Sequence, residues 1–202
     1  MDIIVKTDSQ ELEYSNESIL KGILHYTKFD GEFIGRNGMN YIIGGGKRAE
    51  TVKQLGFSNN PTEAECLSKM KTFRLEAYPE FKFTVHKDLV NEVQSIYKDL
   101  KKLGVVLNKY QGSYCFRSIK NPNKPGSRVL SMHSFGCAID LNYDKNVFVP
   151  NGRPLLDPKE DDTIGGVVRT LESPIVKTFA KYGWGWGGRY GDYMHFSKAN
   201  GA

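Results

Sequence analysis

The sequence predicts an α+β fold with a small, mostly antiparallel sheet flanked by helices. Its strands and helices follow one another without the regular alternation that is typical of parallel sheets. An amphipathic helix is expected over residues 87–103, and further strands over 112–119, 136–143 and 193–197. The 202 residues are 39% hydrophobic and 25% charged, which favours one buried core and argues against a disordered or collagen-like chain.

We interpret residues 1–60 as an N-terminal extension, distinct from a second domain over residues 61–202. A helix is expected at 16–28, where apolar side chains recur at helical spacing. The dipeptide Asn37-Gly38, which lies between two apolar runs, is the strongest short signal for a hairpin. This part of the chain carries no recognisable chemistry, so its role stays open.

A short helix is expected at the start of the second domain and should end near residue 70. Asn60 is a favoured helix-capping residue, Pro61 suits the first helical position and Glu63 suits the third. The apolar side chains that this helix should bury are Ala64, Leu67 and Met70.

Strands are expected next, at 71–78 and 81–85, and they lead into the amphipathic helix. The apolar side chains of that helix recur every three or four residues and share one face: Leu89, Val90, Val93, Ile96, Tyr97, Leu100 and Leu103. Gly104 should end it. A later short helix is expected from Ser173 to Gly183, because a capping serine, a proline at the first position and a final glycine occur in order.

The chain is basic, with 28 Lys and Arg against 23 Asp and Glu and a net charge of +5. A positive charge favours polyanionic partners, such as nucleic acid or an anionic cell wall. Nucleic acid is disfavoured because no basic helix or aromatic ladder occurs. No run approaches the roughly 20 apolar residues that span a bilayer, and the first residues lack a signal-peptide pattern, so synthesis in the cytoplasm is expected.

The three cysteines, Cys66, Cys115 and Cys137, are odd in number and contain no Cys-x-x-Cys pair. Neither a disulfide framework nor a thiolate zinc site is indicated. We expect all three to be buried thiols, with a reactive thiol as the alternative.

Three segments resemble known binding motifs, but their spacing or their neighbouring residues do not fit the corresponding sites. Residues 183–188 have the glycine spacing of a dinucleotide site, but they follow a helix and precede none. Residues 44–47 lack the first glycine and the Ser or Thr of a phosphate-binding loop. Residues 140–144 imitate the opening of a calcium loop, whose turn glycine and final acid are missing.

Two of the four histidines, His133 and His195, lie in the least ordinary stretches of the chain, residues 131–140 and 186–196. A catalytic zinc ion is commonly held by three protein ligands of mixed imidazole and carboxylate type, with a fourth position for water. His133, Asp140 and His195 would supply such a set. On the residues alone, the commoner alternative is that each histidine is a surface or structural residue.

The motifs Ser-x-His-x-x-Gly-x-Ala-x-Asp at 131–140 and Trp-Gly-Gly…Asp-x-Met-His-Phe at 186–196 resemble the M15 family of zinc peptidases. This family comprises D-alanyl-D-alanine carboxypeptidases and phage endolysins. The resemblance extends loosely from residue 70 to residue 197 and includes Phe116-Arg117-Ser118, whereas residues 1–60 lie outside it. It implies a hedgehog-type, DD-peptidase-like fold with zinc in a cleft.

The resemblance also implies roles for single residues. His133, Asp140 and His195 would hold Zn²⁺. Asp192 would be the catalytic base, and Arg117 would stabilise the oxyanion.

Three further residues are assigned to substrate binding. The resemblance implies that Ser131 lies close to the substrate pocket. Trp186 and Tyr190, together with Trp184, could form an aromatic wall over the cleft, because they alternate with glycines. The alternative is that at least one tryptophan belongs to the core.

The implied activity is hydrolysis of peptidoglycan stem peptides. We favour an endolysin-type L-Ala-D-Glu endopeptidase, with a D-Ala-D-Ala carboxypeptidase or a non-catalytic zinc-containing cell-wall-binding module as alternatives. The positive charge would attract the protein to the anionic peptidoglycan. The oligomeric state stays open, with a monomer favoured. We expect the protein to act at the bacterial cell wall, with phage lysis as one route of release.

Overall fold

The structure is a computed structural model that describes residues 3–7, 10–14, 41, 43, 45–119, 128–149 and 156–199. The chain divides into two compact units. One comprises residues 1–39 and 120–127, and the other comprises residues 40–119 and 128–202.

The described part of the first unit is a hairpin of β1 (Ile3–Thr7) and β2 (Gln10–Tyr14), paired antiparallel with Ile3 opposite Tyr14. This hairpin is not among the elements predicted above. Its signal is the alternation of Glu11, Leu12, Glu13 and Tyr14, which is typical of a strand. The helix predicted at 16–28 and the hairpin predicted around Asn37-Gly38 lie outside the described residues.

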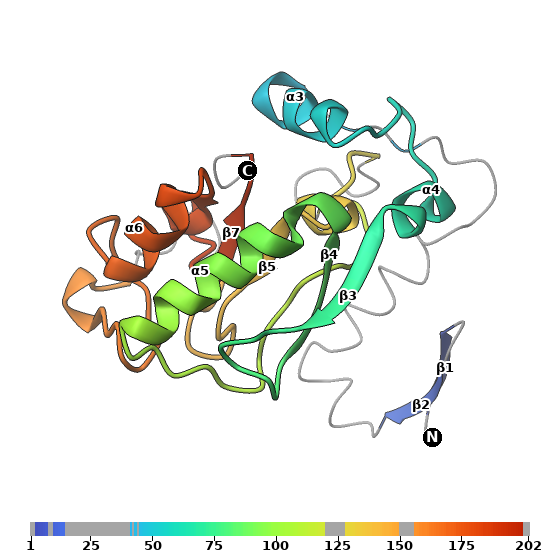
Figure 1. Cartoon of the computed structure of the whole chain (residues 1–202). Helices are drawn as coiled ribbons and strands as arrows, with labels where there is room; N and C mark the ends of the chain where they lie inside the picture. Colours follow the sequence, from blue (N-terminus) through green and yellow to red (C-terminus); the bar gives the residue numbers. More distant parts are fainter. Residues whose placement is uncertain are drawn as a thin grey trace. The chain divides into compact units, whose positions relative to one another are not determined.

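In its described residues the second unit contains two small antiparallel sheets, which confirms the predicted α+β class (Figure 1). In one sheet β3 (Met70–Arg74) pairs with β4 (Lys82–His86). The other sheet has the order β5-β7-β6 and consists of β5 (Ala138–Asp140), β7 (His195–Ser197) and β6 (Gly185–Trp186). All of these strand pairs are antiparallel.

The predicted amphipathic helix is α5 (Val90–Lys102), and a short 3-10 turn at Lys87–Leu89 precedes it. The side chains that α5 buries completely are Val93, Ile96, Tyr97 and Leu100. Gly104 follows with a φ of +75°, in the left-handed region that favours glycine. The helix therefore ends where the sequence predicts.

The second predicted helix is α6 (Pro174–Lys181), which begins at the predicted proline and is followed by Gly183 with a φ of +75°. α6 packs against α5 (Figure 1). Between them, the rings of Tyr97 and Phe179 meet edge to face, with centroids 6.5 Å apart. Phe179 also stacks on Phe196 of β7, with ring centroids 3.9 Å apart. These contacts form the core on one face of the β5-β7-β6 sheet.

The described residues between 41 and 59 pack with the rest of the second unit. Tyr41, Ile43 and Phe57 are buried in its core, as is Val52 of α3 (Gly46–Gln54). This compact unit begins at residue 40. A functional division between residues 1–60 and 61–202 stays a prediction.

The predicted short helix is α4 (Glu63–Ser68), but its cap and its buried face differ from the prediction. Thr62 caps it by accepting a hydrogen bond from the backbone N–H of Glu65 at 3.1 Å. Ala64 and Leu67 are exposed, Met70 is only partly buried, and Cys66 occupies the core. Six residues make fewer than two turns, so α4 buries only one position completely.

The strand predicted at 112–119 is wrong as a regular element, because this segment changes partners along its length. It forms two isolated antiparallel bridges, Gly112 with Asp140 and Ser118 with Leu130. Between them the N–H of Tyr114 donates to the Thr84 carbonyl at 3.0 Å, and the N–H of Arg117 donates to Ser134 Oγ at 2.9 Å.

The strands predicted at 136–143 and 193–197 exist as the shorter β5 and β7. Gly136, with a φ of +62°, still belongs to the preceding turn, and Asn142, with a φ of +44°, follows β5. Cys66 and Cys137 are buried as predicted, whereas Cys115 is exposed, which corrects the prediction for that residue. None of the helices in the described residues is long and apolar enough to cross a membrane.

Candidate metal centre

His133 lies on a 3-10 turn at Met132–Phe135 that the local sequence specifies. Ser131 caps this turn, and its Oγ accepts a hydrogen bond from the His133 backbone N–H at 3.4 Å. Gly136 ends the turn in the left-handed conformation. A Cβ at Gly136 would collide with the His86 backbone and with Met70 Sδ, so glycine also lets the turn pack against β4. The turn directs His133 toward the end of β5.

Asp140 and His195 meet because of the register of the sheet. β5 pairs with β7 so that Asp140 lies directly opposite His195. Cross-strand partners in an antiparallel sheet place their side chains on the same face. Their neighbours Ile139 and Phe196, which are also partners, face the opposite side, toward the core.

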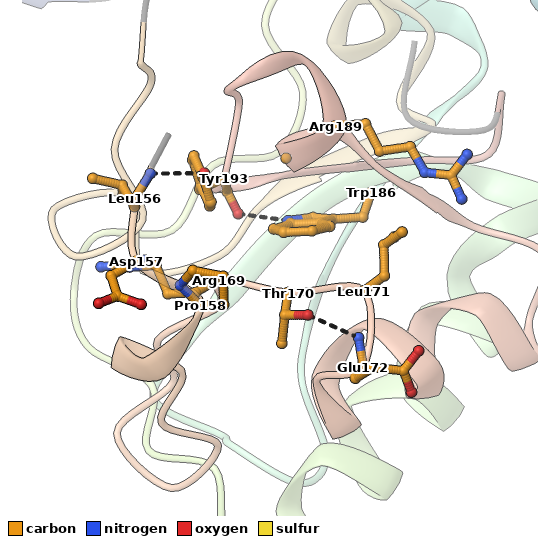
Figure 2. A pocket seen from close by; sticks show the side chains of 11 residues that line it. Leu156, Asp157, Pro158, Arg169, Thr170, Leu171, Glu172, Trp186, Arg189 and Tyr193 are labelled. Carbon is orange, nitrogen blue, oxygen red and sulfur yellow. Dashed lines mark hydrogen bonds between the residues drawn. The ribbon is translucent and has the colours of Figure 1, made fainter. Parts of the chain in front are cut away.

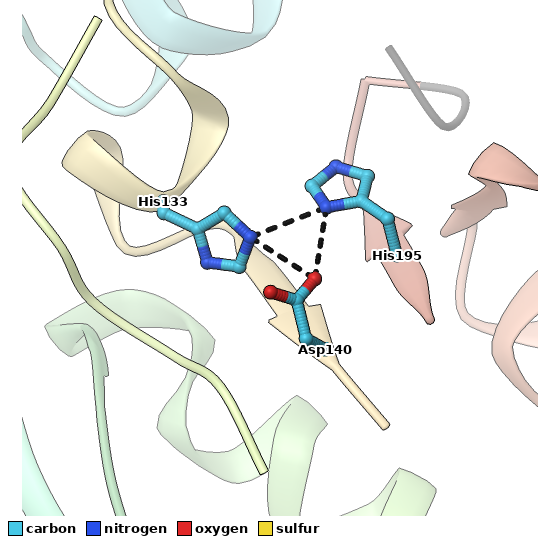
Figure 3. Close-up of side chains that lie close together, drawn as sticks. All are labelled: His133, Asp140 and His195. Atoms are coloured by element: carbon cyan, nitrogen blue, oxygen red, sulfur yellow. Dashed lines mark hydrogen bonds and ion pairs between the residues drawn. The ribbon is translucent and has the colours of Figure 1, made fainter. Parts of the chain in front are cut away.

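The three side chains converge on one point (Figure 3). Asp140 Oδ1 lies 3.2 Å from His133 Nε2 and 3.2 Å from His195 Nδ1. The two ring nitrogens, His133 Nε2 and His195 Nδ1, are also 3.2 Å apart. His133 and His195 are buried and Asp140 is partly buried, so the triangle is largely enclosed by protein.

These distances fit a tetrahedral metal ion. Ligand atoms about 2.0–2.1 Å from such an ion lie about 3.3 Å from one another. The observed spacing of 3.2 Å between the three atoms is close to this value. The imidazole and carboxylate donors suit a divalent transition metal, with zinc among the ions that such a set binds.

The tautomer of His133 is set by a contact outside the triangle. Its Nδ1 lies 2.5 Å from the carbonyl oxygen of Ser113, so Nδ1–H donates to that oxygen. In neutral His133 the Nε2 lone pair then points at Asp140 and His195.

The carboxyl group of Asp140 is held in its ionised form. Burial alone would raise its pKa, but the nearby charge of His133 and the contacts with His133 and His195 hold that pKa well below its usual range. The group is therefore a carboxylate at neutral pH, as a metal ligand must be.

Asp192 lies beside the triangle, three residues before His195. Its N–H donates to the Gly187 carbonyl at 3.1 Å, and its own carbonyl accepts from the His195 N–H at 3.3 Å. Burial raises the pKa of the Asp192 carboxyl group, which also interacts electrostatically with all three candidate ligands and with Arg117. The arrangement suits a group that takes up and releases a proton next to the metal position.

Arg117 is fixed by its backbone next to the His133 turn. Its N–H donates to Ser134 Oγ at 2.9 Å, and its carbonyl accepts from the Ser131 N–H at 2.8 Å. The positive charge of Arg117 opposes the effect of burial on the pKa of the Asp192 carboxyl group.

The residues assigned to substrate binding occupy different surroundings. Ser131 is buried and caps the His133 turn, whereas Tyr190 is 66% exposed two residues before Asp192. Trp184 is a core residue that packs on Phe179 at 6.1 Å, as the alternative stated above allows.

Trp186 is placed away from the three ligands. It pairs with Phe196, so it shares the core-facing side of the sheet, opposite His195. Its indole N–H donates to the Tyr193 carbonyl at 2.9 Å (Figure 2). Together with Arg169 and Leu171 it lines a pocket of about 670 Å³. The substrate-binding roles of Ser131, Trp186 and Tyr190 stay predictions.

Phe148, which the sequence did not single out, borders Asp192. The two residues form an isolated antiparallel bridge, next to which the Val149 N–H donates to the Gly191 carbonyl at 2.7 Å. In this non-hydrogen-bonded type of pair, the side chains lie close together on the same face. Phe148 is 52% exposed and offers apolar surface beside the candidate base. A lone Phe carries no chemical signature that could have marked it.

Comparison with known proteins supports this site. Residues 125–198 match the M15 peptidase family model that is described as D-alanyl-D-alanine carboxypeptidase. No curated protein and no solved structure matches the chain. The matched segment, which is shorter than half the chain, contains all three residues of the triangle and Asp192 but not Arg117. Residues 125–198 are thus similar to the M15 peptidase family, and the three candidate metal ligands lie within them.

Proposed function

We propose that the protein is a zinc-dependent peptidase that hydrolyses the stem peptides of peptidoglycan. The observation that carries this proposal is the triangle of His133 Nε2, Asp140 Oδ1 and His195 Nδ1, with sides of 3.2 Å, inside the segment that matches the peptidase family. The family also implies the hedgehog-type, DD-peptidase-like fold, with which the small antiparallel sheets agree.

His133, Asp140 and His195 would hold the zinc ion. When bound, zinc lowers the pKa of its water from about 15.7 toward about 7 and polarises the scissile carbonyl. Asp140 contributes a negative charge to this site, and the two imidazoles contribute neutral nitrogen donors. A site with one carboxylate and two imidazoles retains a net positive charge with a divalent ion, which favours developing negative charge on the substrate.

Asp192 would accept the proton of the attacking water and deliver it to the leaving amine. A group that exchanges protons near neutral pH needs a pKa above that of an ordinary carboxyl group, and burial moves the pKa of Asp192 in that direction. General acid-base catalysis of this kind contributes about 10²–10⁴ in rate.

Arg117 would donate hydrogen bonds to the negative oxygen of the tetrahedral intermediate. A preorganised donor at such an oxygen contributes about 3–4 kcal/mol. The backbone bonds of Arg117 to Ser131 and Ser134 keep it beside the His133 turn.

For the scissile bond we propose L-Ala-D-Glu within the stem, as in endolysins, and a site of action at the bacterial cell wall after phage lysis. The net charge of +5 supports attraction to an anionic wall. The alternative is the terminal D-Ala-D-Ala bond, which the description of the matching family favours. A purely structural, wall-binding role is less favoured, because such a site needs neither Asp192 nor Arg117.

The test is mass spectrometry of fragments released from defined muropeptides. Zinc-loaded protein should cleave the stem, chelator should abolish cleavage, and added zinc should restore it. Asp192→Asn should bind zinc normally but lose about 10²–10⁴ in rate, whereas the control Asp144→Asn, at an exposed acid, should retain the full rate.

Intact stems after incubation with zinc-loaded protein would contradict the proposed activity. Equal binding of peptidoglycan by the wild-type protein and Asp192→Asn, with no cleavage by either, would instead support the binding module. The masses of the fragments distinguish the L-Ala-D-Glu bond from the D-Ala-D-Ala bond.

A further inference from the structure

We propose that Gly112 and Ser113 are positioning residues for the metal site, which hold Asp140 and His133 in place from outside the segment that matches the family. The proposal rests on the proposed function, since it concerns the same metal site. Neither residue supplies a ligand atom, and neither belongs to the motifs singled out in the sequence.

Gly112 controls the space around the Asp140 carboxylate. The two residues exchange both backbone hydrogen bonds: the Gly112 N–H donates to the Asp140 carbonyl at 2.8 Å, and the Asp140 N–H donates to the Gly112 carbonyl at 2.9 Å. In such a pair the two side chains would lie on the same face. The missing side chain of Gly112 therefore leaves room for the carboxylate.

The room is tight. A Cβ on Gly112 would lie 2.9 Å from Asp140 Cβ and 2.9 Å from Asp140 Oδ2. Gly112 is not among the described glycines with positive φ, so the space beside Asp140, and not the backbone conformation, requires a glycine here. Because β7 fixes Asp140 from its other side, an added methyl group would have to displace the carboxylate or part the two backbones.

Ser113 controls the orientation of the His133 ring. Its carbonyl oxygen accepts the Nδ1–H of His133 at 2.5 Å, which leaves Nε2 directed at the triangle. Partners of this kind fix both the ring orientation and the tautomer of metal-binding histidines.

The Ser113 carbonyl is itself anchored to β4. Ser113 Oγ accepts a hydrogen bond from the Thr84 N–H at 3.2 Å, and the Thr84 carbonyl accepts one from the Tyr114 N–H at 3.0 Å. Ser113, which is held by β4, thus fixes the orientation of the His133 ring. Its neighbour Gly112 pairs with Asp140 at the edge of the sheet.

The experiment compares Gly112→Ala with the control Gly45→Ala. Gly45 is a suitable control because a Cβ there meets no atom within 4 Å and its φ of −128° suits any residue. Titration calorimetry with Zn²⁺ should show affinity about 10–100-fold weaker for Gly112→Ala and nearly unchanged for Gly45→Ala. The visible spectrum of the Co²⁺-loaded protein should change in Gly112→Ala alone, because it reports the ligand geometry. Near-UV circular dichroism checks that both variants fold.

A second variant and a measurement without metal keep the proposal testable if Gly112→Ala does not fold. Ser113→Ala removes the bond from Thr84 but keeps the carbonyl that contacts His133, so it should weaken Zn²⁺ binding measurably, by less than the roughly 10–100-fold expected for Gly112→Ala. ¹⁵N NMR of the histidine rings in the metal-free protein should find His133 protonated at Nδ1.

The outcomes separate this inference from the proposed function. Wild-type affinity in both Gly112→Ala and Ser113→Ala, or a His133 ring protonated at Nε2 only, would overturn the inference and leave the zinc site intact. A wild-type protein that binds no divalent ion would overturn the proposed function, while the NMR result would still decide the role of Ser113.

Discussion

The segment that matches the peptidase family and the segment before it contribute to the candidate metal centre in different ways. Residues 128–149 and 156–198 supply the three ligand side chains and Asp192. Residues 41–119 supply Arg117 and the backbone groups around the ligands, among them the Ser113 carbonyl and the Gly112 bridge. The chemistry and its support thus come from different parts of the chain.

This difference explains why the sequence motifs contain the metal ligands but not the groups that hold those ligands in place. A metal ligand must have a particular type of side chain, so His133, Asp140 and His195 form a recognisable sequence pattern. Supporting contacts use carbonyl oxygens and empty space, which many residue types or a glycine can provide. The family match over residues 125–198 therefore includes the ligands but not Gly112 and Ser113, which position them.

The largest expected effect is the loss of a ligand. Asp140→Ala should weaken Zn²⁺ binding by more than about 100-fold, since it removes a ligand outright, whereas loss of an outer contact costs about 10–100-fold. Titration calorimetry measures this, with Asp144→Ala, at an exposed acid four residues away, as the control. Similar losses in both variants would show that the site lies elsewhere.

Metal binding should also stabilise the fold, because the three ligand atoms are brought together only in the folded chain. With free zinc at 100 times its dissociation constant, the free energy of unfolding should rise by about 2.7 kcal/mol. Thermal unfolding with zinc and with chelator measures the change. Asp140→Ala should show no such rise, and an equal rise in that variant would contradict the assignment of the ligands.

Substitution of Arg48, which lies in α3, tests whether residues of the segment 41–59 stabilise the matched segment. Its buried guanidinium donates to the carbonyls of Ile43 and Leu130, the latter directly before Ser131. Burial lowers the pKa of Arg48 to about 10, so it remains charged near neutral pH. Arg48→Met should leave two buried carbonyls unpaired and lower the free energy of unfolding by about 1–3 kcal/mol.

Urea unfolding measures this loss, and the exposed neighbour Lys47 provides the control Lys47→Met. If the two variants had the same free energy of unfolding, the contacts of Arg48 would not stabilise the matched segment.

The smallest effect concerns the thiols, which differ in exposure across both regions. Burial raises the pKa of Cys66 to about 12 and that of Cys137 to about 12, whereas Cys115 is exposed. Iodoacetamide at pH 8 should therefore label Cys115 in the native protein and label the other two only after unfolding. Mass spectrometry of the labelled peptides locates the adducts, and rapid labelling of Cys137 would contradict its burial.

The elements that could be predicted from the sequence are those with local signals. α5 follows from the spacing of Val93, Ile96 and Leu100, and its end follows from Gly104. The proximity of His133, Asp140 and His195 was predicted through the resemblance to a family, since spacing along the chain does not bring them together.

The elements that could not be predicted depend on tertiary partners. Residues 112–119 have the composition of a strand, but their amides bind β4 and the His133 turn in succession. The inward position of α4 is Cys66 rather than Leu67, because a helix of six residues is oriented by its neighbours more than by its own pattern. The roles of Gly112 and Ser113 appear only once Asp140 and His133 are in place.

The central claim is that one divalent ion binds between His133, Asp140 and His195. Anomalous X-ray diffraction from crystals of the protein grown with zinc tests it most directly. We predict one strong peak per chain, about 2.0–2.2 Å from His133 Nε2, His195 Nδ1 and an oxygen of Asp140. Ordered side chains with no peak between them, or a zinc ion held by other residues, would contradict the account.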